Sequence, residues 1–571
     1  MTQLISLNRR AFLGGGVALA AAAGLRPAWA HSVSQGVAAK AEGTLSGEDI
    51  RLVVDRTRFS VDGRPGHAVA INGTIPAPLI RLKEGQNVRL TVENRLTDED
   101  TSIHWHGFIV PFQMDGVPGI SFPGIRPGQS FTYEFPIKQS GTYWYHSHSG
   151  LQEQLGHYGP IIIDPAGADP VAYDREHVIV LSDWTFMHPH GLFTRLKQEG
   201  GFFNRNKRTL ADKMSGKRDP LSAADAKMFG KMRMDPTDIS DVTAAAYTYL
   251  INGHSPAENW TGLFRAGERV RLRIINAASQ SIFNIRIPGL KLVVVATDGI
   301  NVRPVEVDEL QIGNAETYDL IVQPDDRPYT FIAEGIDRSG MGVATLAPRE
   351  GMRAEVPPLR ERPTLTMMDM GMMDHSAHGG GPSMAMDHSM RDKSKVSFPV
   401  GPGVDMISPM AMDRSGDPGI GLENVGHKVL TYKDLVSLKP NSDTRVPTRR
   451  IDIHLTGNME RFMWSMDGEK LSENPEPYRF ARNERVRLRL INDTMMTHPM
   501  HLHGHFFEIV NGHGPNQPLK HTVRVLPGGY VDLDLTADAP GDWAFHCHLL
   551  YHMHAGMMRV VSIRPLEGAH A

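Results

Sequence analysis

The sequence predicts an all-β protein with three Greek-key β-sandwich domains and a Met-rich linker. Three observations lead to this prediction. The chain has 571 residues, enough for roughly three to four domains of ordinary size. One short turn-and-strand unit recurs three times along the chain. The strand-like segments are short, alternate apolar and polar residues, and end at Gly and Pro, whereas convincing helical periods are few.

The composition is that of a globular protein and excludes several classes of function. Hydrophobic residues make up 40% and charged residues 22%, so the chain is neither disordered nor collagen-like. Lys and Arg number 60 against 64 Asp and Glu, which leaves no global basic field for nucleic acid. The 27 His, 29 Met and single Cys favour soft and borderline metal ligands over disulfides.

Residues 1–30 are typical of a cleavable export signal. Arg9-Arg10 precedes an apolar stretch over 11–25 and a small-residue pattern at Ala28–Ala30. A twin arginine in this place predicts the twin-arginine route, which carries folded proteins across the bacterial inner membrane. A Sec signal or a short anchor is the alternative, but the stretch is shorter than the roughly 20 residues that span a bilayer. We therefore expect a periplasmic protein without a membrane span.

The repeated unit lies at 71–94, 251–276 and 466–492. Each copy opens on Asn-Gly or Asp-Gly, continues through a loop, and ends in a strand that alternates apolar residues with polar ones, mostly Arg, before a final Asn. This period of two predicts a half-buried strand in each of three homologous domains.

The repeats and the local composition divide the chain into five segments. We expect a signal peptide, a first sandwich domain, a second, a Met/His-rich linker with little packed structure, and a third domain, at 1–30, 45–168, 170–350, 355–426 and 427–565. An insertion at about 195–241 is polar and net basic. We expect it to be a solvated surface excursion with a short helix.

Four histidine clusters carry the chemistry, and all of them lie in the first and third domains. A His-X-His pair on one strand turns both imidazoles to the same face, and histidine is the commonest protein metal ligand. An isolated pair is more often a satisfied core or surface pair. Here, however, the pairs fall at equivalent places in the first and third repeats, and the middle copy has no histidine at that place, which makes the second domain a spacer. The clusters are His104 and His106; His146 and His148; His498, His501 and His503; and His546 and His548, followed by His552 and Met557.

Cys547 lies between His546 and His548 and has no partner for a disulfide. If the side chains alternate, its thiolate faces one way and both imidazoles face the other, so one strand links two metal sites. Two His, one thiolate and a weak axial Met form the blue-copper arrangement. Zinc is the alternative, but Met557 favours copper because a thioether is a poor zinc ligand.

These motifs, in this order, resemble those of the multicopper oxidases, and the resemblance covers most of the chain beyond residue 30. It implies three cupredoxin-like domains, four copper ions per chain, and reduction of dioxygen to water at a cluster of three coppers between the first and third domains. The ligands that it implies are His498, Cys547, His552 and Met557 for type 1 copper; His104 and His501 for type 2; His106, His146 and His548 for one type 3 ion; and His148, His503 and His546 for the other.

The resemblance also implies catalytic roles. Cys547 with His546 and His548 would carry electrons from the type 1 copper to the cluster, and Asp115 matches an acidic residue that delivers protons there. A turn Asp before Gly is the alternative for Asp115. Some members carry a Glu directly after the last type 1 histidine as a proton relay, whereas this chain has Met553 at that place.

The segment 367–390 is rich in Met, Asp and His. Thioethers favour Cu(I), so a flexible tract of this kind can bind extra ions, although an incidental linker is the alternative. With the export signal, the tract resembles the bacterial periplasmic copper-resistance oxidases, whose oxidation of Cu(I) would confer tolerance.

We therefore expect a monomeric periplasmic oxidase whose reductants are Cu(I), phenols or both, with dioxygen as acceptor and other periplasmic copper-handling proteins as partners. Two alternatives stay open: a copper-sequestering protein with incidental oxidase activity, and a laccase or ferroxidase that acts on organic reductants or Fe(II). Met459, Met463 and Met466 either line an electron-accepting pocket or fill the core, and we expect core filling.

Overall fold

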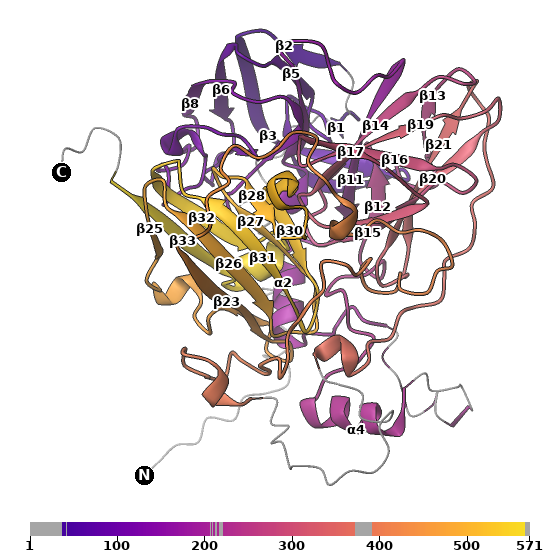
Figure 1. The fold of residues 1–571 in the computed structure, drawn as a ribbon. Helices are drawn as coiled ribbons and strands as arrows, with labels where there is room; N and C mark the ends of the chain where they lie inside the picture. The colour runs from indigo at the N-terminus through magenta and orange to yellow at the C-terminus, as the bar shows by residue number, and fades with distance from the viewer. Residues whose placement is uncertain are drawn as a thin grey trace, which may run out of the picture.

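The computed structural model describes residues 37–40, 43–205, 207, 209, 211, 214–215, 221–371 and 391–565. Within them the chain forms six β-sheets, two in each of three domains, and Figure 1 shows the domains grouped around a common centre. The predicted all-β fold of three sandwich domains is confirmed. The predicted signal and residues 372–390 of the Met/His segment lie outside the described residues.

The first domain packs two five-stranded sheets against each other. Its core lies between them and takes Leu52 and Leu90 from one sheet, Ile80 and Ile161 from the other. One sheet contains β1 (Val37–Ala38), β3 (Asp49–Val61), β4 (Arg64–Ile71), β6 (Asn87–Asn94) and β8 (Ser130–Pro136). The other contains β2 (Thr44–Ser46), β5 (Leu79–Lys83), β7 (His104–His106), β9 (Gly141–His146) and β10 (Tyr158–Asp164).

The second domain packs a six-stranded sheet against a five-stranded one. The larger contains β11 (Arg175–Trp184), β12 (Thr248–Ile251), β14 (Val270–Asn276), β16 (Leu292–Thr297), β17 (Ile300–Val307) and β19 (Thr317–Val322). The smaller contains β13 (Trp260–Leu263), β15 (Phe283–Arg286), β18 (Glu309–Ile312), β20 (Tyr329–Gly335) and β21 (Met341–Ala347).

The third domain packs a seven-stranded sheet against a five-stranded one. The larger contains β22 (Met412–Asp413), β23 (Arg449–Asn458), β24 (Met463–Met466), β26 (Arg485–Asn492), β28 (Phe507–Ile509), β29 (Leu519–Lys520) and β31 (Gly529–Thr536). The smaller contains β25 (Tyr478–Ala481), β27 (His498–Leu502), β30 (Thr522–Val525), β32 (Gly541–Cys547) and β33 (Met558–Arg564).

The repeated unit forms the same structure in all three domains. Its final strand is β6, β14 or β26, and each pairs in parallel with one long strand and antiparallel with another. The opening turn explains the Asn or Asp of the repeat, since Asn72, Asn252 and Asp467 have φ of 51°, 49° and 52°. Asn and Asp tolerate this left-handed backbone, and each of the three also accepts a backbone N–H through its side chain.

The middle copy departs from the predicted half-buried strand. Every residue of β14 is buried, including Arg271 and Arg273. Both guanidinium groups form ion pairs with Asp319, and Arg273 also pairs with Glu176. The second domain thus buries both faces of this strand, and paired charges make that burial possible.

The expectation that residues 195–241 form a solvated surface excursion is wrong. The last turn of α2 (Pro189–Gln198) opens this segment, and α4 (Ala223–Met232) lies within it. Leu196 and Phe203 belong to the core that the second and third domains share. Phe229 and Ile239 belong to a second apolar cluster, together with Met406 of the predicted linker. The described residues named here are therefore packed against the body of the molecule, as Figure 1 shows for α2.

The described parts of the linker contain little regular structure, yet they are packed. Leu365, Met370 and Met406 are buried in the same apolar cluster as Phe229. Met466 is fully buried and Met463 half-buried, which agrees with core filling for these two. Among the described residues, no helix is long and apolar enough to cross a membrane.

Candidate metal centres

Four short segments from two domains bring the predicted histidines together. β7 and β9 are antiparallel neighbours that place His104 opposite His146, and β27 and β32 place His501 opposite His546. Because side chains alternate along a strand, both rings of each His-X-His pair face the same side. We use the name histidine cluster for the eight residues His104, His106, His146, His148, His501, His503, His546 and His548.

The histidine cluster lies between the first and third domains. The ring centroids of His104 and His503 are 3.9 Å apart. Those of His106 and His548 are 5.0 Å apart, and those of His148 and His546 are 5.1 Å apart. Each of these pairs joins one domain to the other, so neither domain contains the cluster alone.

The nitrogens of the histidine cluster fit a set of metal ligands. In the groups His104, His501, His503 and His148, His503, His546, one nitrogen from each ring lies within 4.8 Å of the others. A buried nitrogen without a hydrogen bond is costly, so several in one place indicate a group that they bind. Among the described residues, the nitrogens without a partner include His104 Nε2, His106 Nδ1, His146 Nε2, His148 Nε2, His501 Nε2 and both of His548.

The opposite nitrogens of these rings are held in place. Asp115 holds two of them, since its carbonyl oxygen is 2.7 Å from His104 Nδ1 and its Oδ2 is 2.8 Å from His503 Nδ1. His501 Nδ1 lies 2.7 Å from the carbonyl oxygen of His521. Hydrogen bonds of this kind fix the tautomer and direct the other nitrogen toward a metal.

His146 is held by a residue that sequence reasoning missed. Its Nδ1 lies 2.7 Å from Glu153 Oε2, and both side chains are buried. Glu153 follows His148 closely and stands between two glutamines that Leu151 and Leu155 flank, which is the only signal in the sequence.

Burial favours the neutral form of seven rings of the histidine cluster. It lowers the pKa of His503 to about 4 and that of His548 to about 3. The pKa values of His106, His146, His148, His501 and His546 are also well below the ordinary range, first because of burial and then because of neighbouring rings. Neutral imidazole is the form that binds metal ions.

A second centre lies around Cys547. Its Sγ is 3.5 Å from His498 Nδ1 and 3.8 Å from His552 Nδ1, and these two nitrogens are 3.2 Å apart. Met557 is fully buried, and its carbonyl oxygen accepts the backbone N–H of Cys547. Burial raises the pKa of the Cys547 thiol, so the thiolate forms only with a cation such as a metal ion beside it.

The rings of this centre are also held from behind. His498 Nε2 is 2.7 Å from Thr494 Oγ1, and His552 Nε2 is 2.7 Å from Asp241 Oδ2. Trp464 stacks on His552 with 3.8 Å between ring centroids. Sequence reasoning missed Asp241, which belongs to the second domain, because only the fold brings it to α5 (Leu550–Ala555).

β32 joins the two centres, as the alternation of its side chains predicted. Cys547 Sγ faces His498 and His552, whereas the preceding His546 turns its Nε2 to within 3.0 Å of His503 Nε2. The backbone carbonyl of Cys547 also lies 3.0 Å from His546 Nδ1. A few bonds therefore separate the sulfur from the histidine cluster.

A cavity of about 450 Å³ lies at the insertion, where it meets Met459 and Glu460 of the third domain. Four acidic residues line it, together with two basic ones and two methionines: Glu199, Asp235, Asp238, Glu460, Lys207, Arg233, Met234 and Met459. Met459 thus lines this cavity in addition to packing in an apolar cluster. We call it the acidic cavity.

The acidic cavity is connected to the Cys547 centre by two short stretches of chain. Asp238 is followed three positions later by Asp241, which holds His552. Met459 precedes Phe462, whose ring centroid is 5.9 Å from that of His552.

The chain has three sandwich domains, and one strand connects its thiolate site to an imidazole cluster between two of them. This combination is that of a metal-dependent oxidase. Models of the multicopper oxidase family match this chain at 53–168, 175–351 and 444–567. The chain belongs to the multicopper oxidase family, and it is an oxidoreductase that uses oxygen as its electron acceptor.

Curated relatives and solved structures agree with this assignment. The chain is 46% identical to copper resistance protein A of Escherichia coli, with 98% of this chain and 100% of that protein covered. It is 31% identical to multicopper oxidase MmcO of Mycobacterium tuberculosis, over 96% and 95% of the two chains. The structure of Fet3p, a multicopper oxidase that functions in iron import, has a similar fold, with a TM-score of 0.63 at 20% identity over 92% of this chain and 91% of that one.

Proposed function

We propose that this enzyme oxidises Cu(I) one electron at a time, reduces dioxygen to water, and thereby confers copper tolerance. Copper ions in the two centres would supply the one-electron chemistry, and four such ions match the four electrons that dioxygen requires. The proposed ligands are His498, Cys547, His552 and Met557 for type 1; His104 and His501 for type 2; and His106, His146, His548 and His148, His503, His546 for the type 3 pair.

The observation that carries this proposal is the position of Cys547 between His546 and His548. The thiolate lies in the electron-accepting centre, and its two neighbours lie in the histidine cluster. A covalent route through Cys547 and its carbonyl, which faces His546 Nδ1 at 3.0 Å, suits electron transfer between the two centres.

Asp115 supports the reduction of dioxygen by handling protons. Its carboxylate is buried, with Oδ2 2.8 Å from His503 Nδ1 and Oδ1 3.3 Å from His104 Nδ1. Although burial opposes the charged form, His503 and His104 hold the pKa of Asp115 below its usual value. Asp115 therefore stays ionised, and its negative charge would attract the protons that the reduction of dioxygen consumes.

The acidic cavity favours a metal cation over a phenol as substrate. Carboxylates attract cations, and the thioethers of Met234 and Met459 prefer Cu(I). Asp238 is buried where it lines this cavity, and Asp241, three positions later, contacts His552. Residues 238–241 would therefore connect Cu(I) that binds here with the ring that would receive its electron.

Oxygen consumption with different reductants tests this proposal. We expect the copper-loaded protein to have a higher kcat/KM for Cu(I) than for Fe(II) or a phenol. Cys547→Ser should remove the blue absorption and slow oxygen consumption at least about 100-fold, which is about 2.7 kcal/mol in activation free energy. Wild-type protein that holds copper yet consumes no oxygen with Cu(I) would refute it.

The sequence supports three further parts of the proposal: export through the twin-arginine route to the periplasm, action as a monomer, and binding of extra Cu(I) by the Met/His segment, where other periplasmic copper-handling proteins would exchange it. Deletion of residues 372–390 separates catalysis from storage. Lost tolerance with unchanged oxygen consumption would favour sequestration as the main role.

A further inference from the structure

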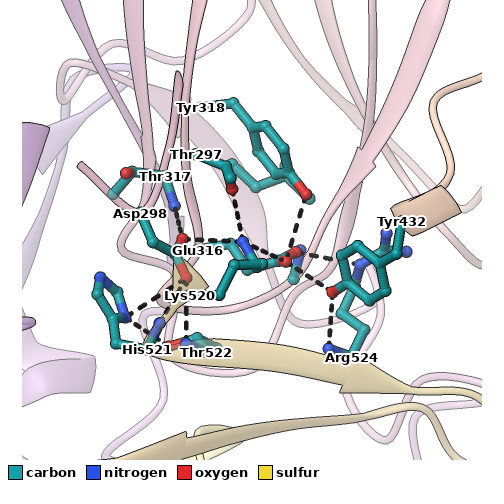
Figure 2. A network of polar contacts seen from close by, with 12 residues as sticks. Thr297, Asp298, Glu316, Thr317, Tyr318, Tyr432, Lys520, His521, Thr522 and Arg524 are labelled. Atoms are coloured by element: carbon teal, nitrogen blue, oxygen red, sulfur yellow. Dashed lines mark hydrogen bonds and ion pairs between the residues drawn. The ribbon is translucent and has the colours of Figure 1, made fainter. Parts of the chain in front are cut away.

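The corner between β29 and β30 is anchored in the second domain (Figure 2). It consists of Lys520, His521 and Thr522, all of them buried. Lys520 Nζ lies 3.1 Å from Asp298 Oδ1 and 3.1 Å from Glu316 Oε1, and both carboxylates belong to the second domain. A buried ammonium group is tolerated only with partners of this kind.

Asp298 binds the backbone of the corner as well as its side chain. Its Oδ2 accepts the backbone N–H of His521 at 3.2 Å and that of Thr522 at 3.1 Å. Its Oδ1 accepts the backbone N–H of Thr317 at 3.0 Å, which fixes the carboxylate to β19. Figure 2 shows these contacts converging on Asp298, so one side chain sets the position of three consecutive residues.

The other side of the same corner touches two rings of the histidine cluster. The carbonyl oxygen of His521 lies 2.7 Å from His501 Nδ1. Thr522 Oγ1 lies 3.3 Å from His501 Nδ1 and 3.3 Å from His106 Nε2, and 3.0 Å from His521 Nδ1. His501 Nδ1 and His106 Nε2 are thus both held by hydrogen bonds. The other nitrogen of each ring, His501 Nε2 and His106 Nδ1, has no hydrogen-bond partner.

The corner therefore holds one ring from the first domain and one from the third. The hydroxyl of Thr522 is a single atom that both rings share, so a displacement of Thr522 changes their angle to one another. Backbone and side-chain contacts to Asp298 prevent that displacement. The second domain supplies no ring to the histidine cluster. Through the corner, it nevertheless fixes the orientation of His106 and His501.

We propose that Asp298 and Thr522 are positioning residues for the type 2 copper and its neighbouring type 3 ion. Asp298 acts through the corner, and Thr522 acts through His106 and His501. The inference rests on the proposed ligand roles of these two histidines. It gives the second domain a role in assembling the oxygen-reducing site.

Metal affinity and spectroscopy of the fully loaded protein test this inference. Thr522→Val removes the hydroxyl and keeps the shape, Thr522→Ser keeps the hydroxyl, and Asp298→Asn removes the charge. We expect Thr522→Val and Asp298→Asn each to weaken the binding of type 2 copper about 10-fold in a chelator titration. The titration is followed by the electron paramagnetic resonance signal of type 2 copper, measured relative to the blue absorption of type 1 copper. Thr522→Ser should restore the wild-type ratio.

Asp319→Asn is the matched control. Asp319 is also a buried carboxylate of the second domain that pairs with arginines, but it does not contact the corner. Its loss should lower thermal stability without changing the ratio of the two copper signals. An unchanged ratio in both Thr522→Val and Asp298→Asn, or an equal fall in Asp319→Asn, would overturn the inference. Wild-type protein without a type 2 signal would instead refute the ligand assignment itself, and the inference with it.

Discussion

Three carboxylates stand behind histidines of the proposed copper sites. Asp115 contacts His503, Glu153 contacts His146, and Asp241 contacts His552. A carboxylate in this position makes the imidazole a stronger donor and fixes its orientation. The three differ in origin, since two come from the first domain and Asp241 comes from the second.

Asp115→Asn separates the two halves of the reaction. The amide keeps the size of the side chain but loses the charge that faces His503, so we expect oxygen reduction to slow by about 10-fold to 100-fold. Electron uptake from Cu(I) should not change, because Asp115 does not contact the Cys547 centre. Stopped-flow bleaching of the blue absorption without oxygen, compared with steady-state oxygen consumption, measures both. Equal slowing of both steps would contradict the assigned role.

Asp238 predicts a pH dependence for cation capture. Burial, followed by the nearby charges of Asp241 and Asp235, raises the pKa of Asp238 to about 8, although Lys207 opposes this. Its carboxylate is therefore mostly protonated at neutral pH and becomes an anion as pH rises through that value. We expect the KM for Cu(I) to fall between about pH 6 and about pH 9, and to vary less with pH in Asp238→Asn.

The same shift has a consequence for stability. The folded state binds the proton of Asp238 more tightly than the unfolded state, in which the pKa of this carboxyl has its ordinary value of about 3.8. Protonated Asp238 therefore contributes fully to the free energy of unfolding below about pH 4, and this contribution is lost progressively as the pH rises toward 8. Asp238→Asn should become relatively more stable than wild type over this interval in thermal melts, whereas Asp225→Asn, outside the acidic cavity, should track wild type. A parallel pH profile for Asp238→Asn would contradict the shifted pKa.

The strands and the histidine motifs could be predicted from sequence because their signals are local. β6, β14 and β26 follow from alternation within eight residues or fewer, and the His-X-His pairs follow from the same period of two. The insertion could not be predicted in this way. The insertion is mostly polar, so its composition did not indicate that Phe229 and Ile239 are buried. Their packing partners, such as Met406, lie far away in sequence.

A substitution in helix α4 would test whether the insertion shapes the acidic cavity. Phe229 is 2% exposed and packs in the apolar cluster beneath this helix. Phe229→Ala should cost about 3 to 5 kcal/mol of local stability, which loosens residues 221–241 and raises the KM for Cu(I). Hydrogen exchange of this segment measures the loosening. Phe202→Ala, at a position 42% exposed in the same insertion, is the control and should change neither quantity. Unaltered exchange in Phe229→Ala would refute the packing argument.

The second domain is more than a spacer between the other two. Asp241 holds His552 of the Cys547 centre, and Asp298 holds the corner beneath the histidine cluster. Sequence patterns predicted the absence of ligands in this domain but could not predict these contacts, because each joins residues more than 200 positions apart. The Cys547 centre therefore depends on the second and third domains, and the histidine cluster depends on all three.

Removal of copper should loosen this arrangement of domains. The unpartnered nitrogens of His104 and His148 in the first domain and of His501 and His548 in the third would lose the ions that bridge them. Ions that bind only the folded state stabilise it by about 4 kcal/mol per site at a thousandfold excess over Kd. We expect apoprotein to unfold at a lower temperature in calorimetry, with a transition that broadens as the domains uncouple. Cys547→Ser, which loses the thiolate but keeps the histidine cluster, should retain most of the copper-dependent shift. Apoprotein that melts as the loaded protein does would show that the domain interfaces hold without metal.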